Sequence, residues 1–128
     1  MDKQGPRVLL VDDEESIQQT LTAVLPPAGY AVYQVRDGKE AVQRVPFVRP
    51  DLILLDLALP DMDGKDVIRH LREWTVAPII VISVRDEESE KVSSLDAGAH
   101  DYVTKPFTMP ELLARMRATL RSVSANLL

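Results

Sequence analysis

Five short segments rich in aliphatic or β-branched residues alternate with segments of helical periodicity, and this alternation constrains the fold most strongly. The five segments are "RVLLV" (residues 7–11), "YAVYQV" (30–35), "DLILL" (51–55), "PIIVIS" (78–83) and "DYVTK" (101–105). The first, third and fourth are largely apolar throughout, which is typical of strands covered on both faces in a parallel sheet. The pattern therefore predicts five strands, most of them buried.

The intervening segments carry apolar residues at a spacing of three or four, which predicts amphipathic helices. Pro26 and Pro27 are expected to end the first helix, Pro46 to close the second, and Pro110 to occupy the first position of the last. The apolar stripes fall within residues 17–25, 41–45, 67–71, 92–99 and 112–120. This is a (βα)₅ pattern, and it predicts a single α/β domain, a doubly wound parallel sheet with helices on both faces.

Composition excludes several classes of function. The 128 residues include 15 Lys and Arg against 20 Asp and Glu, and no basic cluster stands out, so the chain alone is a poor candidate for binding nucleic-acid phosphates. There is no cysteine, which excludes disulfides, thiolate metal sites and a cysteine nucleophile. The start "MDKQGPR" lacks an apolar signal segment, and the apolar runs are too short to span a bilayer. We therefore expect a cytoplasmic protein without membrane contacts.

Charged or hydroxyl residues stand at the ends of four predicted strands. Asp12 and Asp13 follow the first strand, Asp56 the third, Ser83 closes the fourth, and Lys105 ends the fifth. In an open parallel sheet these positions share the carboxyl edge, where ligands bind at the point of strand-order reversal. With the strand order 2-1-3-4-5, all five residues are expected around one crevice.

Each residue also has an ordinary interpretation. Residues 12–15 suit the first turn of a helix, Ser83 suits a helix cap and Lys105 a solvated surface. Their coincidence at one edge favours a functional site instead. Three neighbouring carboxylates repel one another and require a cation, and hard oxygen ligands favour Mg²⁺. With such an ion, an Asp56 oxygen can attack a phosphoryl group, and Lys105 and Ser83 can contact the product.

The motifs "VLLVDDEE", "PDLILLDLALPDMDG", "PIIVIS" and "LDAGAHDYVTKPF" occur in this order and at this spacing. Together they resemble the receiver domain of two-component response regulators over nearly the whole chain. The resemblance implies a flavodoxin/CheY-like fold, a receiver domain over residues 1–122, and a helix end or linker start at 123–128. It implies a phosphorylation-activated switch rather than an enzyme, with self-catalysed phosphotransfer and autodephosphorylation only.

The resemblance also assigns roles to individual residues. Asp56 is implied as the phosphoacceptor, with Asp12, Asp13 and the backbone carbonyl of Ala58 completing a Mg²⁺ site. Ser83 is implied as the hydroxyl that follows the phosphate, Tyr102 as the switch aromatic and Lys105 as the phosphate-binding lysine. The Lys105–Pro106 bond is expected to be cis.

The last third of the chain is similar to the OmpR/PhoB class of transcription regulators, and within it to the KdpE-type potassium regulators. The resemblance implies a sensor histidine kinase as phosphodonor and a homodimer on phosphorylation. DNA contact is implied only through a C-terminal domain that this sequence lacks, so we expect an excised receiver rather than a free-standing one. The implied dimer surface is a helix–strand–helix face with charges of both signs: Lys91, Asp96, Asp101, Glu111 and Arg115.

Some positions depart from the family pattern. Val84 stands where a small residue is usual and is expected to narrow access to the phosphate, and His100 replaces a common aspartate.

Three other functions remain to be weighed. A haloacid-dehalogenase-type phosphatase needs a second aspartate where Ala58 stands. A flavodoxin-like flavin binder needs a phosphate loop where "DDEES" stands. A pseudo-receiver acting only as a binding module is disfavoured by the retained acids and Lys105.

Overall fold

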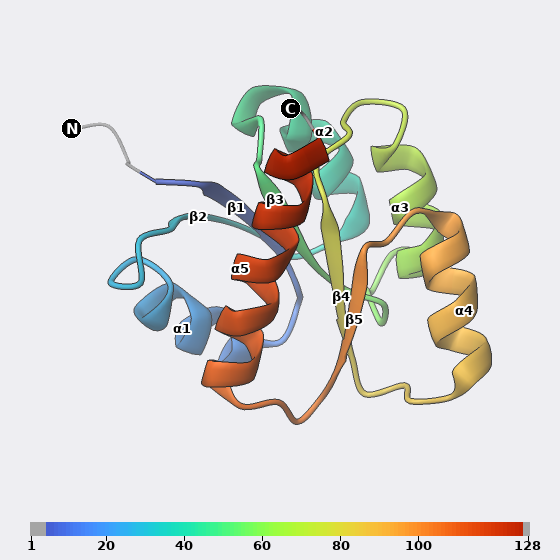
Figure 1. The fold of residues 1–128 in the computed structure, drawn as a ribbon. Helices are drawn as coiled ribbons and strands as arrows, with labels where there is room; N and C mark the ends of the chain where they lie inside the picture. The colour runs from blue at the N-terminus through green and yellow to red at the C-terminus, as the bar shows by residue number, and fades with distance from the viewer. Residues whose placement is uncertain (1–4, 127–128) are drawn as a thin grey trace.

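The computed structural model describes residues 5–126 and shows one five-stranded parallel sheet with helices packed on both faces (Figure 1). The elements alternate as the sequence pattern predicts. They are β1 (Arg7–Val11), α1 (Glu15–Val24), β2 (Ala31–Val35), α2 (Gly38–Val48), β3 (Leu52–Asp56), α3 (Gly64–Leu71), β4 (Ile79–Ser83), α4 (Glu88–Ala97), β5 (Asp101–Thr104) and α5 (Met109–Asn126).

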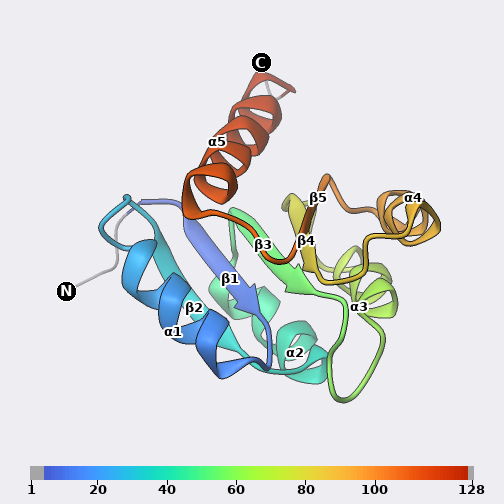
Figure 2. The same ribbon diagram turned by 90° about the horizontal axis from the view of Figure 1, so that it is seen from below.

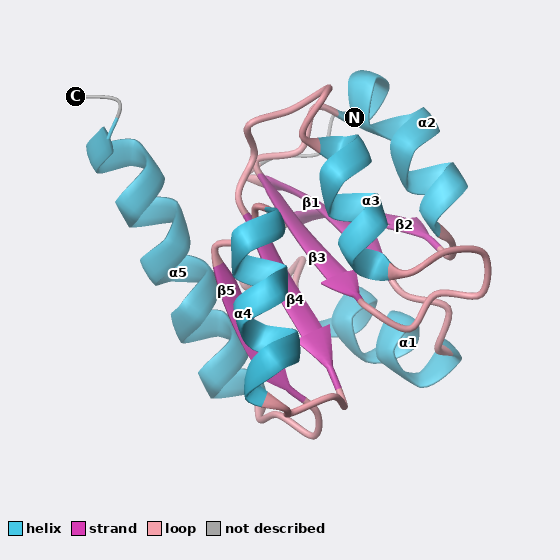
Figure 3. Ribbon diagram, turned by 90° about the vertical axis from the view of Figure 1, so that its right-hand side faces the viewer, coloured by secondary structure: helices cyan, strands magenta, loops and turns pink. Residues whose placement is uncertain are grey.

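The strand order is β2-β1-β3-β4-β5, which confirms the predicted topology and doubly wound α/β class. Seen along the sheet, α1 and α5 cover one face, while α2, α3 and α4 cover the other (Figure 2). The strand order reverses at β1, which pairs with β2 on one side and β3 on the other. Short parallel strands joined by helices bring all their carboxyl ends to one edge (Figure 3).

Alternation along the strands divides the core into two layers. In β3, Ile53 and Leu55 pack under α2 and α3, whereas Leu52 and Leu54 pack under α1 and α5. All five β3 residues are buried, which explains why this strand reads as a continuous apolar run. The same alternation directs the next residue of the second set, Asp56, toward the side of α1 and α5.

Helix boundaries correct two of the sequence predictions. Helix α1 ends before Pro26 as expected, but Pro46 lies inside α2, which continues to Val48. A proline in the last turn removes one backbone hydrogen bond near an end that frays in any case, so the helix tolerates it. Helix α5 starts at Met109, one residue before the expected start at Pro110.

The predicted apolar stripe of α4 is not a core stripe. Val92 is 50% exposed and Leu95 45% exposed, and Ser94 is the buried residue of this helix. Helix α4 therefore buries a small polar residue and leaves about half of each larger apolar side chain exposed to solvent.

The predicted boundary at residue 122 falls inside α5. The helix continues to Asn126, and residues 127–128 lie outside the described part of the chain. The division between receiver and linker thus stays a prediction. Within residues 5–126, no helix combines the length and apolarity needed to cross a membrane.

Candidate functional site

The carboxylates of Asp12, Asp13 and Asp56 meet at the carboxyl edge of the sheet, as predicted. One oxygen from each lies within 4.8 Å of the others. Asp12 is 1% exposed and Asp56 7% exposed, whereas Asp13 is open to solvent. The strands place them, because β1 and β3 are neighbours and both carry the acid at their carboxyl end. Three close hard-oxygen donors, one of them facing water, form a donor set that fits Mg²⁺.

Lys105 enters the same cluster from the end of β5. Its Nζ lies 3.1 Å from Asp12 Oδ2 and 3.5 Å from Asp56 Oδ2. Its third partner is Glu14, with Nζ 3.1 Å from Glu14 Oε2. The Lys105–Pro106 peptide bond is cis, as expected.

Charge and burial act against each other in this cluster. Burial raises the pKa of Asp12, a hydrogen bond from Glu14 N–H lowers it, and the nearby Asp56 charge raises it, with a net increase. Burial alone would lower the pKa of Lys105, but the charges of Asp12 and Asp56 raise it above its ordinary value. The raised pKa of Asp12 shows that its charged form is disfavoured in this cluster, and an added cation would stabilise that form.

The turn after β3 holds the Asp56 carboxylate in place. The Ala58 backbone N–H donates to Asp56 Oδ1 at 3.1 Å, so the Ala58 peptide lies beside this carboxylate. The Gly64 N–H donates to the Leu57 carbonyl at 2.9 Å and closes the turn onto α3. Ala58 itself is exposed and offers no side-chain acid, which argues against the phosphatase alternative.

Ser83 ends β4 and Tyr102 lies on β5, and both contact the loop that leads to α4. The buried Ser83 Oγ accepts from the Arg85 N–H at 3.0 Å, and the Tyr102 hydroxyl donates to the Arg85 carbonyl at 2.5 Å. Burial raises the pKa of Tyr102, so the hydroxyl is protonated and able to donate. Both predicted switch residues therefore contact the same short loop between β4 and α4.

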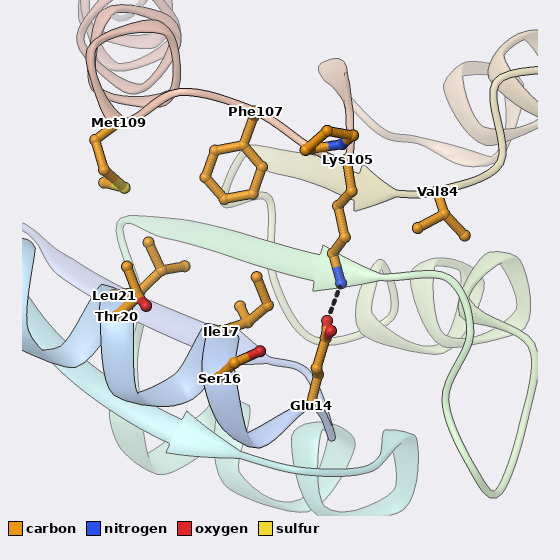
Figure 4. Close-up of a pocket in the computed structure, with 10 residues that line it drawn as sticks. Glu14, Ser16, Ile17, Thr20, Leu21, Val84, Lys105, Phe107 and Met109 are labelled. Carbon is orange, nitrogen blue, oxygen red and sulfur yellow. Dashed lines mark hydrogen bonds and ion pairs between the residues drawn. The ribbon is translucent and has the colours of Figure 1, made fainter.

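A hollow of about 430 Å³ opens beside Lys105, between α1 and the loop before α5. Its floor is apolar, with Ile17, Leu21, Phe107 and Met109, and Glu14 and Lys105 face each other at one end (Figure 4). Val84 also lines it and is 67% exposed. Val84 therefore flanks the approach to Lys105, and its effect on access stays a prediction.

The residues predicted for the dimer surface lie on α4, β5 and α5. Arg115 pairs with Asp101 at 3.2 Å and with Glu111 at 3.3 Å, and Lys91 Nζ lies 5.9 Å from the centre of the Tyr102 ring. Asp96 is exposed. Arg115, Asp101 and Glu111 thus pair within the chain, and a role of this surface between chains stays a prediction.

Sequence reasoning missed several groups that support the site. They are Glu14 as a partner of Lys105, the Gln18 amide behind the acids, and Asp61, which accepts from the Gly38 and Lys39 N–H groups. In the sequence these residues cannot be told from polar surface residues, because the fold of the backbone determines which groups they contact.

A doubly wound sheet with an acidic trio and a lysine at its carboxyl edge defines a receiver-type domain. Residues 8–117 match the response regulator receiver domain family. The chain belongs to this family.

Relatives and solved structures agree. The chain is 47% identical to the KDP operon transcriptional regulatory protein KdpE of Escherichia coli K12 over 119 residues, covering 93% of this chain and 53% of that protein. It is 47% identical to the response regulator MprA of Mycolicibacterium vanbaalenii over 121 residues, covering 94% and 52%. The chain thus spans about half the length of these OmpR/PhoB-type relatives.

Among solved structures, the fold resembles the BeF3-activated N-terminal receiver domain of Klebsiella pneumoniae RstA, with a TM-score of 0.85 and 32% identity. That match covers 90% of this chain and 98% of the other. A CheY-like receiver domain protein from Methanospirillum hungatei gives a TM-score of 0.89 at 26% identity, covering 95% and 98%. The CheY-like class predicted from the sequence is confirmed.

Proposed function

We propose that this chain is a phosphorylation-activated switch in which Asp56 accepts a phosphoryl group. The observation that carries the proposal is the convergence of Asp12, Asp13 and Lys105 on the Asp56 carboxylate. The donor is a phosphohistidine of a sensor kinase. An Asp56 oxygen bonds to phosphorus, the phosphorus–nitrogen bond breaks, and the imidazole leaves and takes up a proton. Water later hydrolyses the acyl phosphate, so the chain catalyses only its own phosphorylation and dephosphorylation.

Mg²⁺ would be held by Asp12, Asp13, Asp56 and the Ala58 carbonyl. When bound, it would neutralise negative charge on the carboxylates and the incoming phosphoryl oxygens. Lys105, which already lies 3.5 Å from Asp56 Oδ2, pairs with the phosphoryl group. The buried Asp12 and Asp56 carboxylates are oriented by hydrogen bonds from the Glu14 N–H and the Ala58 N–H.

The apolar hollow beside Lys105 supports a protein as the phosphodonor. Its aliphatic and aromatic floor lies next to Lys105, whereas a small acyl phosphate such as acetyl phosphate offers only a methyl group to place there. Helix α1 and the loop before α5 are thus the proposed contact surface for the kinase.

Ser83 and Tyr102 would carry the effect of phosphorylation from Asp56 to the loop before α4. A phosphoryl group adds roughly −1.5 to −2 charges and three strong acceptor oxygens. The Ser83 hydroxyl leaves the Arg85 N–H and donates to the phosphoryl group, and the loop to α4 moves with it. Tyr102 is already bonded to the Arg85 carbonyl, so a shift of this loop acts on the Tyr102 ring directly. The expected further inward rotation of Tyr102 is a prediction for the phosphorylated state.

The α4–β5–α5 surface is the proposed dimer interface. It combines the half-exposed Val92 and Leu95 with the charged residues around Arg115. Single surface ion pairs contribute only about 0–1 kcal/mol, but a two-fold repeat around an apolar centre sets register and partner choice. The names of the KdpE relatives support regulation of transcription, with DNA bound by a further domain outside this sequence.

Mass spectrometry after incubation with acetyl phosphate and Mg²⁺ tests the central proposal. We expect one added phosphoryl group, lost when Mg²⁺ is chelated. Asp56→Asn should abolish it, and Asp51→Asn is the matched control, because Asp51 is exposed at the opposite edge of the sheet. Unchanged phosphorylation of Asp56→Asn would refute the assignment.

A further inference from the structure

Gln18 places a buried amide behind the acidic cluster. It belongs to α1 and is 1% exposed. Its Nε2 donates to the Asp12 carbonyl at 2.6 Å and to the Val35 carbonyl at 3.0 Å. The Asp12 N–H donates to the same Val35 carbonyl at 3.2 Å. One side chain therefore joins the ends of β1 and β2 where the acidic residues leave the sheet.

The Asp12 carbonyl belongs to the peptide group that links Asp12 to Asp13. Since a peptide group is planar, holding its carbonyl fixes the direction in which the chain continues to Asp13. The Asp12 carboxylate has restraints of its own, from the Glu14 N–H at 2.8 Å and from Lys105. Asp13 is exposed, and within residues 5–126 its carboxylate has no hydrogen bond or ion pair. Its position therefore depends on the backbone that Gln18 holds.

The chemistry of the amide suits this position. A neutral donor holds a carbonyl without adding charge to carboxylates that already repel one another. The Gln18 Oε1 atom is buried and finds no hydrogen-bond partner in the described part of the chain. An apolar residue would fill the same space without an unsatisfied oxygen, so packing alone does not account for a glutamine here.

We propose that Gln18 is a positioning residue for the metal site: its two N–H donors orient the Asp12–Asp13 peptide so that both carboxylates face Asp56. This role rests on the proposed function, because it requires that the cluster bind Mg²⁺. Gln18 contacts neither the metal nor the phosphoryl group and acts only through the backbone.

Mg²⁺ affinity measured by calorimetry on the unphosphorylated protein tests this role. Gln18→Met keeps the length of the side chain and removes both donors, and we expect the Mg²⁺ Kd to rise about tenfold, at the lower end of supporting-shell effects. Phosphorylation by acetyl phosphate should slow at limiting Mg²⁺ and approach the wild-type rate at saturating Mg²⁺. Gln18→Asn keeps the amide but shortens its reach, and serves as a second variant with the same expected direction.

Leu25→Ala is the matched control. Leu25 is fully buried just after the far end of α1, so its loss destabilises the domain without touching the cluster, and the Mg²⁺ Kd should stay within twofold of wild type. Equal Kd changes in Leu25→Ala and Gln18→Met, or no change in either Gln18 variant, would overturn the role. If wild-type protein is phosphorylated on Asp56 yet binds no Mg²⁺, the role of Gln18 is wrong, but the assignment of Asp56 as phosphoacceptor stands. Wild-type protein that gains no phosphoryl group at all would overturn the proposed function, and this role with it.

Discussion

Gly64 lies so close to the turn after β3 that even one methyl group should disturb the phosphoacceptor. A Cβ atom at this position would stand 2.6 Å from Leu57 Cα, 2.8 Å from Leu57 Cδ2 and 3.0 Å from the Asp56 carbonyl oxygen. The Gly64 N–H also donates to the Leu57 carbonyl at 2.9 Å, which holds the two backbones at this separation. Gly64→Ala must therefore move either α3 or the segment that carries Asp56 and Ala58.

The magnitude follows from the contact distances. Ordinary contact begins near 3.4 Å, so the backbone must give by roughly 0.8 Å at Leu57 Cα. Overpacking of this kind costs roughly 1–3 kcal/mol. Replacing glycine by alanine in a helix returns about 1 kcal/mol, so the net loss of stability should be at most about 2 kcal/mol. A displacement of about 1 Å at a reacting group reduces the rate up to roughly 100-fold, so phosphorylation should slow markedly.

Urea unfolding and the rate of phosphorylation by acetyl phosphate measure both effects. Gly38→Ala is the matched control, because Gly38 begins α2 as Gly64 begins α3. A Cβ there meets the Val67 and Met62 side chains, at 2.6 Å and 2.7 Å, rather than backbone, so the adjustment falls on side chains and not on the turn that carries Asp56. The control should phosphorylate at nearly the wild-type rate. A Gly64→Ala protein as stable and as reactive as wild type would show that the close approach does not position Asp56.

Four further outcomes are expected. Burial tends to raise the pKa of Asp61, but hydrogen bonds from the Gly38 and Lys39 N–H groups lower it overall. Asp61→Ala should therefore lose about 1 kcal/mol of unfolding free energy at neutral pH. This difference, present above the ordinary aspartate pKa, should vanish as pH falls through the lowered value in urea unfolding series. Ser83→Ala should gain the phosphoryl group yet fail to dimerise in sedimentation. Ala58→Asn should shorten the phosphoryl half-life, since alanine cannot orient a water. Arg115→Ala should weaken the beryllofluoride-induced dimer and leave phosphorylation of Asp56 intact.

The fold was predictable because its determinants are local. Each strand is marked by a run of buried aliphatic residues, and each helix by a spacing that its own turns impose. Only some helix ends were predicted wrongly. Pro46 lies inside α2, for example, because a proline near the end of a helix destabilises the helix too little to end it. The topology then followed from connectivity, since parallel strands joined by helices leave few arrangements.

The location of the cluster residues was predictable for the same reason, and the location of their supporting groups was not. Asp12, Asp56 and Lys105 lie at or just after strand ends, so the sheet alone brings them to one edge. Gln18 and Asp61 act through backbone groups at the ends of other elements, and no spacing in the sequence marks which carbonyl or N–H they meet. In the sequence each is one polar residue among many on a helix or a loop.

Helix α4 shows where periodicity is ambiguous in principle. Val92 and Leu95 repeat at the helical spacing of core residues, yet both are about half exposed, and Ser94 is the buried residue of the helix instead. An apolar stripe indicates only that one side of a helix is buried against something. The burying surface can be a partner protein as well as the core of the same domain. Lys91 of the same helix lies over the Tyr102 ring, and the Tyr102 hydroxyl contacts the loop between β4 and α4, so a partner docked on α4 would lie close to the proposed switch residues. The exposure of Val92 and Leu95 thus supports, on grounds of burial alone, the surface proposed for the dimer around Arg115.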